Sequence, residues 1–193
     1  MSTTDRSDTT RDLAVGAVGG VAAYVLGYLI VFVTQRGRVG ESLRGINFVA
    51  DLIGGDPIPP WKAVGWVFYN AHVVATEVPT PLGGVRVVNF IAESDAGSLA
   101  AMYLVPPALL LVAGLLAGRI AGVTEPIEGV RAGGFVVTGY LPLALAGVLV
   151  FGYAIGDATI APILPTAGLL AGIVYPAVFG AIGGAAATLL ADG

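Results

Sequence analysis

The residues of this 193-residue chain that could do chemistry are a lone histidine and several tyrosines. His72 is the only histidine, and it follows Tyr69 and Asn70 closely in the sequence. A histidine acts as an acid, a base or a metal ligand when carboxylates or further ligands are placed beside it. No spacing in the sequence supplies such partners, and the chain contains no cysteine. We therefore predict that His72 is a structural, hydrogen-bonded histidine. We expect no catalytic residue, no metal site and no cofactor.

A second group of residues combines tyrosine with proline at a similar depth in three apolar segments. Its members are Tyr103, Pro106, Pro107, Tyr140, Pro142, Tyr175 and Pro176. Proline removes one backbone hydrogen bond from a helix and frees a carbonyl, which a tyrosine hydroxyl or a water can satisfy. Two interpretations remain open: a layer of kinks that lines a pathway or gate, or ordinary kinked helices in which tyrosines fill space.

The composition indicates what kind of fold must carry these residues. Hydrophobic residues make up 56% of the chain and charged residues 11%, and the mean hydropathy is +0.87. A soluble domain of about 150 residues still leaves roughly 30% of its surface in water, and this chain lacks the polar residues to cover such a surface. A soluble enzyme and a disordered regulator are thereby excluded. The net charge of −4 also argues against nucleic acid as a partner.

Four stretches without a charge are long enough to cross a bilayer as helices. They cover residues 13–34, 99–118, 132–156 and 166–190. About 20 apolar residues span the hydrocarbon core, where the backbone must satisfy its own hydrogen bonds. We predict an all-α transmembrane fold: a polar tail over 1–12, and a single membrane domain over 13–193 built as a four-helix membrane bundle.

Residues 35–98, between the first and second spans, are predicted to form a cap outside the membrane. Apolar residues at helical spacing over 39–53 indicate a short amphipathic helix on the membrane surface. Residues 61–74 are too few to span and favour an interfacial or re-entrant helix, with a fifth span as the alternative. Residues 72–92 resemble a β-hairpin that turns at 81–84.

Small residues at four-residue spacing predict where the helices approach one another closely. In lipid, helices associate by close packing and hydrogen bonding rather than by burying apolar surface. The last span carries the longest row of small residues, a pattern typical of a glycine zipper. Pro176 and Thr188 also belong to this row. The glycines predicted to form helix contacts are Gly16, Gly20, Gly114, Gly118, Gly168, Gly172, Gly180 and Gly184. Whether the facing helix belongs to the same chain or to a second copy stays open.

Arginines in the short loops predict the orientation. The loop over 119–131 contains two arginines and the loop over 157–165 contains none, and cytoplasmic loops carry the excess of positive charge. We therefore expect both termini in the cytoplasm and the 35–98 cap outside the cell. Three arginines early in the cap oppose this assignment, but long loops count for less.

The aromatic and proline motifs also resemble a known group of proteins. The segments that carry the likeness are 61–62, 65–72, 88–91, 103–107, 139–142 and 174–176. They are similar to those of small multi-pass membrane proteins of haloarchaea without an assigned function, some of which carry an automatic transporter label. The resemblance implies a salt-adapted membrane protein and transfers no mechanism. An acidic balance with a single lysine, Lys62, agrees with high salt, although a GC-rich genome that prefers arginine codons would produce the same bias.

Together these features predict a protein that is not an enzyme: a scaffold or accessory subunit that presents the cap to partners. The four predicted spans contain no Asp, Glu, Lys, Arg or His, and coupled transport generally needs such residues at depth. The alternative is a small permease or channel for a neutral solute that uses the Pro/Tyr layer. The expected partners are the lipid bilayer and a second membrane protein or a second copy of this chain, without nucleic acid.

Overall fold

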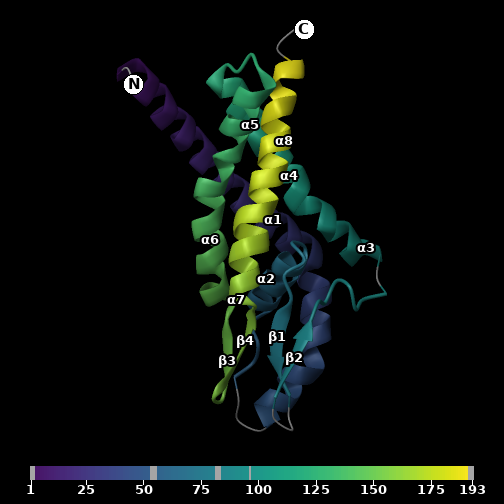
Figure 1. Ribbon diagram of the computed structural model, residues 1–193. Coiled ribbons are helices and arrows are strands. Elements are labelled where there is room, and N and C mark those ends of the chain that lie inside the picture. Colours follow the sequence, from purple (N-terminus) through teal and green to yellow (C-terminus); the bar gives the residue numbers. More distant parts are fainter. Residues whose placement is uncertain (1–2, 53–55, 81–83, 96, 191–193) are drawn as a thin grey trace.

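The computed structural model of the protein describes residues 3–52, 56–80, 84–95 and 97–190 (Figure 1). In these ranges, four helical segments are long and apolar enough to cross a membrane, which agrees with the number expected. They are Thr9–Phe48, Gly97–Ala121, Pro126–Phe151 and Leu164–Leu189. The structure is therefore mostly helical, with a small antiparallel sheet at one end.

The first helix, α1 (Thr3–Leu52), is much longer than the sequence predicted. It includes most of the expected polar tail over 1–12, and it continues through the expected break between a span over 13–34 and a separate amphipathic helix over 39–53. The reason is that only Gly37 interrupts good helix formers at this junction, and one glycine costs about 1 kcal/mol. Gln35 is buried at the same point, so packing holds the helix together.

The other three long segments are each built from shorter helical pieces. The second segment joins α3 (Gly97–Ala100), the 3-10 turn η1 (Ala101–Leu104) and α4 (Val105–Ala121). The third segment joins α5 (Pro126–Gly134) and α6 (Val136–Phe151). The fourth segment joins α7 (Leu164–Thr166), the π-helix η2 (Ala167–Val174) and α8 (Tyr175–Leu189). The predicted third span over 132–156 is therefore displaced toward the N-terminus. Its last residues lie in a strand, because absence of charge does not distinguish a helix from an apolar strand.

The small sheet combines two hairpins that are far apart in the sequence. Its strands are β1 (Thr76–Pro79), β2 (Val85–Val88), β3 (Tyr153–Ile155) and β4 (Ala158–Pro162), in the antiparallel order β2-β1-β4-β3. The first pair is the expected hairpin, although turn residues 81–83 lie outside the described residues. The second pair turns at Gly156, whose φ of 57° is the left-handed conformation that glycine adopts readily. Thr76 pairs with Pro162 and joins the two hairpins.

The short helix α2 (Pro60–Asn70) lies inside the protein, where it packs on α1 and α6. All of its residues from Ala63 to Asn70 are buried. Trp66 anchors it by donating its Nε1–H to the carbonyl of Phe151 at 2.9 Å. Gly65 permits this approach, since a Cβ at that position would collide with the Phe151 ring.

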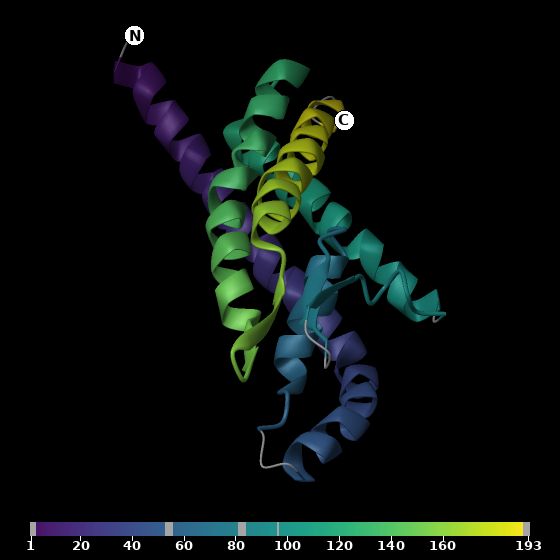
Figure 2. The ribbon, with the colours of Figure 1, turned by 60° about the horizontal axis from the view of Figure 1, so that its bottom comes forward.

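The two ends of the molecule differ in character. Figures 1 and 2 show both termini and the turn between α4 and α5 at one end, with the sheet and the last turns of α1 at the other. The long helices connect these ends.

The predicted glycines lie at contacts between helices of the same chain. Added Cβ atoms at Gly180 and Gly184 would collide with the backbones of Gly133 and Gly129 in α5, and one at Gly114 in α4 would collide with Gly180. Added Cβ atoms would also collide with Gly184 and Ala187 at Gly118, with Phe135 at Gly16 and with Val136 at Gly20. At Gly172 and Gly168 the nearest atoms belong to the side chains of Leu141 and Leu145, and the Cβ at Gly168 would lie 3.2 Å from Leu145. The row on the last helix therefore packs within the chain.

Gly184→Ala is expected to destabilise the protein, because a Cβ would lie 2.9 Å from the backbone carbon of Gly129. We expect a loss of about 1–3 kcal/mol, the usual cost of overpacking, read as a lower thermal midpoint in detergent. Gly37→Ala is the matched control, since nothing lies within 4 Å of a Cβ there. It should stabilise α1 by up to about 1 kcal/mol. Equal midpoints for the two variants would contradict the close α5–α8 contact.

Candidate functional site

The strongest candidate site is a buried polar group that we call the tyrosine–histidine cluster, formed by Tyr24, Tyr69, His72 and Tyr140. Tyr24 comes from α1, Tyr69 from α2, His72 from the turn after α2, and Tyr140 from α6. Their exposed fractions range from 0% to 7%. Three segments that are distant in the sequence, α1, α2 with its following turn, and α6, therefore bring their polar side chains to one place in the interior.

The hydrogen bonds of His72 determine its tautomer. Its Nδ1 lies 2.9 Å from the carbonyl oxygen of Phe68, and its Nε2 lies 2.7 Å from the hydroxyl of Tyr140. Because a carbonyl can only accept, Nδ1 carries the proton and donates it to Phe68. In the neutral ring Nε2 is then an acceptor, and Tyr140 donates its hydroxyl hydrogen to it.

The surroundings of His72 favour the neutral ring. Burial lowers the pKa of His72 to about 4, and the hydrogen bond to the Phe68 carbonyl opposes this shift only in part. The rings of Phe68, Tyr140 and Tyr175 lie around the imidazole, with centroids 4.9 Å, 5.8 Å and 5.2 Å away. With both nitrogens engaged and a low pKa, this histidine is a weak base, and its role in the fold is to connect α2 to α6.

Tyr24 and Tyr69 form the second half of the cluster. Their hydroxyl oxygens are 3.1 Å apart, and Tyr69 also donates to the carbonyl of Ala144 in α6. Since the hydrogen of Tyr69 is used on that carbonyl, Tyr24 must donate to Tyr69. Gly147 makes room for both hydroxyls, because a Cβ there would collide with each of them. In the described part of the chain, every buried side-chain nitrogen and oxygen has a hydrogen-bond partner.

Asn70 connects the cluster to the sheet. Its Nδ2 donates to the carbonyl of Val74 at 2.8 Å and to Thr76 Oγ1 at 3.3 Å, and its Oδ1 accepts from the backbone N–H of Phe90 at 2.8 Å. These bonds close the tight turn after α2. Within that turn Val73 has φ = 61°, a conformation that is strained for a β-branched residue.

The structure brings only part of the predicted Pro/Tyr layer together. Tyr140 and Tyr175 lie on His72, whereas the Tyr103 hydroxyl donates to Asn89 Oδ1 at 3.3 Å. The prolines differ in exposure: Pro106 and Pro176 are buried, Pro107 is half-buried and Pro142 is exposed. The hydroxyls of Tyr140 and Tyr103 thus have separate partners, His72 and Asn89, and a pathway lined by the seven residues stays a prediction.

Sequence reasoning missed Tyr24 and Gly147, and it left His72 without a partner. One signal was available for Tyr24, since Gly16, Gly20 and Tyr24 continue a row with four-residue spacing that faces α6. The hydrogen bond between Tyr140 and His72 joins residues 68 positions apart, so no local sequence pattern could have predicted it. In the residues that the structure describes, no group of three or more His, Asp or Glu side chains could hold a metal ion.

A model of a family of unknown function, DUF7978, matches residues 1–191. The chain belongs to the DUF7978 family. No curated protein and no solved structure matches it. Membership in DUF7978 confirms the expected relation to an uncharacterised family, while the haloarchaeal origin stays a prediction.

His72 should make the stability of this DUF7978 protein depend on pH. Because the folded protein holds its pKa near 4 and an unfolded histidine has a pKa of about 6.5, the unfolded state binds the proton first. Stability should be unaffected above pH 6.5 and should fall below it, by about 2 kcal/mol at pH 5. His72→Gln should be less stable at pH 7.5 but lack this slope. Thermal midpoints between pH 7.5 and 5 measure both, and equal slopes would contradict the assignment.

Relief of strain at Val73 should stabilise the turn after α2. Val73→Asn introduces a residue that adopts the left-handed conformation more readily than valine does. We expect a gain of about 1 kcal/mol, seen as a higher thermal midpoint. Val78→Asn, in strand β1, is the control and should lower the midpoint. A lower midpoint for Val73→Asn as well would show that the turn is not strained.

Proposed function

We propose that this chain is an integral membrane protein whose four long helices cross the bilayer, and that it acts as a non-catalytic scaffold or accessory subunit. The outward faces of these helices support membrane placement, because they expose large apolar side chains. Val18, Val33 and Leu149 have exposed fractions of 70%, 68% and 78%. Side chains of this kind along long helices are stable in lipid and costly in water.

The observation that carries the scaffold proposal is the free edge of strand β2. Among the described strands, β2 pairs with β1 alone. Val85 and Val87 lie on one face of β2 with exposed fractions of 60% and 57%. An exposed apolar edge strand offers backbone hydrogen bonds and side-chain contacts to an incoming strand. We propose that a partner protein binds there.

The attachment of the sheet to the core supports this role. Thr76 in β1 is fully buried and Ile160 in β4 is nearly so, and Asn70 binds the chain after β2 through Phe90. The edge is therefore presented on a rigid base, which lowers the entropy lost when a partner binds.

The same contacts argue for the scaffold over the permease. A pathway through the Pro/Tyr layer would need tyrosine hydroxyls that are accessible to water and solute. Instead Tyr140 donates to His72 within the buried cluster, and Tyr103 donates to Asn89. Opening such a path would cost these hydrogen bonds.

We propose that both termini and the α4–α5 turn are cytoplasmic and that the sheet lies on the opposite side. The chain has no cysteine, so single-cysteine variants report positions without background. Val87→Cys should react with an impermeant maleimide from one side of sealed vesicles and Thr124→Cys from the other, whereas Val25→Cys should be protected by lipid. Reaction of Val87→Cys and Thr124→Cys from the same side would contradict the arrangement.

Edge variants test the scaffold role. A Val85→Lys/Val87→Lys double variant should reduce co-purification of a membrane partner in mild detergent by at least about tenfold, equal to 1.4 kcal/mol, because lysines block edge pairing. The matched control, Ile127→Lys/Val130→Lys at the opposite end, should retain the partner. Undiminished co-purification would overturn the role of β2, and solute flux in proteoliposomes that falls in Tyr140→Phe would favour the permease.

A further inference from the structure

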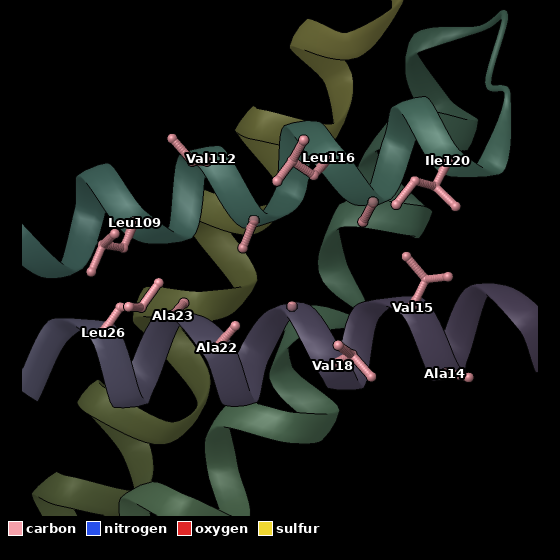
Figure 3. A pocket seen from close by; sticks show the side chains of 13 residues that line it. Ala14, Val15, Val18, Ala22, Ala23, Leu26, Leu109, Val112, Leu116 and Ile120 are labelled. Carbon is pink, nitrogen blue, oxygen red and sulfur yellow. The ribbon is translucent and has the colours of Figure 1, made fainter.

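An apolar groove lies between the first half of α1 and most of the length of α4, from Leu109 to Ile120. Figure 3 shows side chains of both helices pointing into the space between them, among them Val15 and Leu26 from α1 and Leu109 and Ile120 from α4. The volume is about 470 Å³, and every lining residue is apolar or glycine. Small residues on both helices, such as Ala22, keep it open.

The dimensions of the groove match a hydrocarbon chain from one leaflet. On α1 it extends from Ala14 to Leu26, which is about 18 Å at 1.5 Å per residue. One leaflet contributes about 15 Å to the hydrocarbon core. An unfilled groove would also forfeit dispersion contacts along its whole lining.

Two arginines stand at one end of the groove. Arg11 lies one helical turn before Val15, on the face of α1 that lines the groove, and its Nη2 donates to the carbonyl of Ile120 at 3.1 Å. Arg119 precedes Ile120 at the end of α4, and both arginines are exposed. Among the described side chains neither arginine is within 4 Å of a carboxylate. The half-buried Asp12 lies one turn before Gly16, which packs against Phe135, and two turns before Gly19, which lines the groove.

We propose that this groove binds an anionic phospholipid, with one acyl or isoprenoid chain between α1 and α4 and the phosphate at Arg11 and Arg119. The guanidinium fork matches phosphate oxygens, and a cationic end on an otherwise apolar groove matches an amphiphile with an anionic head. An apolar helix from a second copy would fill the groove but leave the arginines unexplained. The inference rests on the proposed placement of the protein in a membrane.

Lipid binding to the purified full chain tests the site. Native mass spectrometry would compare dioleoyl phosphatidylglycerol with dioleoyl phosphatidylcholine, which has the same chains and no net charge. Phosphatidylglycerol should be retained at least about fivefold better, and the Arg11→Gln/Arg119→Gln variant should lose that preference. The control Arg36→Gln/Arg38→Gln, farther along α1, should keep it.

A variant that fills the groove tests whether the acyl chain binds there or whether the arginines attract the lipid by charge alone. Ala22→Phe should reduce retention of both lipids, whereas Ile182→Phe on the exposed face of α8 should not. Equal retention of the two lipids by the native protein would overturn the proposal. A dimer that dissociates in Ala22→Phe would also overturn it and assign the groove to a second copy. The protection of Val25→Cys from maleimide tests membrane placement independently. Failure of the membrane proposal is therefore distinguishable from failure of the lipid-site proposal.

Discussion

The burial of the short helix α2 governs how the long helices around it are positioned. A helix of eleven residues inside the protein exposes the polar groups of its C-terminal turn to apolar surroundings, where an unpaired group costs several kcal/mol. His72 binds the Phe68 carbonyl, and Tyr140 and Tyr24 extend the hydrogen bonds to α6 and α1. The positions of both long helices are thereby coupled to α2 by directional bonds.

Close packing and hydrogen bonding act together around this point. Gly147 admits the two tyrosine hydroxyls and Gly65 admits the Phe151 ring, so the absence of a Cβ is what lets α2 approach α6. On the far side of the bundle the glycines of α8 serve α4 and α5 in the same way. The result is an interior that contains the polar network and an exterior of valine, leucine and isoleucine, an arrangement suited to a lipid surrounding.

Much of the helical architecture could be predicted, because length and absence of charge are local properties. The four long helices and the hairpin of β1 and β2 followed from hydrophobicity and turn residues. The unbroken α1 did not, since its continuation past Thr34 depends on packing of Gln35 and Leu43. The pairing of β1 with β4 joins Thr76 to Pro162, and no local pattern specifies a partner so distant.

Side-chain patterns along the chain were enough to predict four long apolar helices and a hairpin within residues 72–92, because each depends on the side chains of one segment. The contacts of His72 with Tyr140 and of Tyr24 with Tyr69, and the position of Arg11 at one end of the groove between α1 and α4, become apparent only in the folded chain. These arrangements depend on how the helices cross. Crossing geometry follows from the sum of many contacts between segments and is not encoded in any one of them.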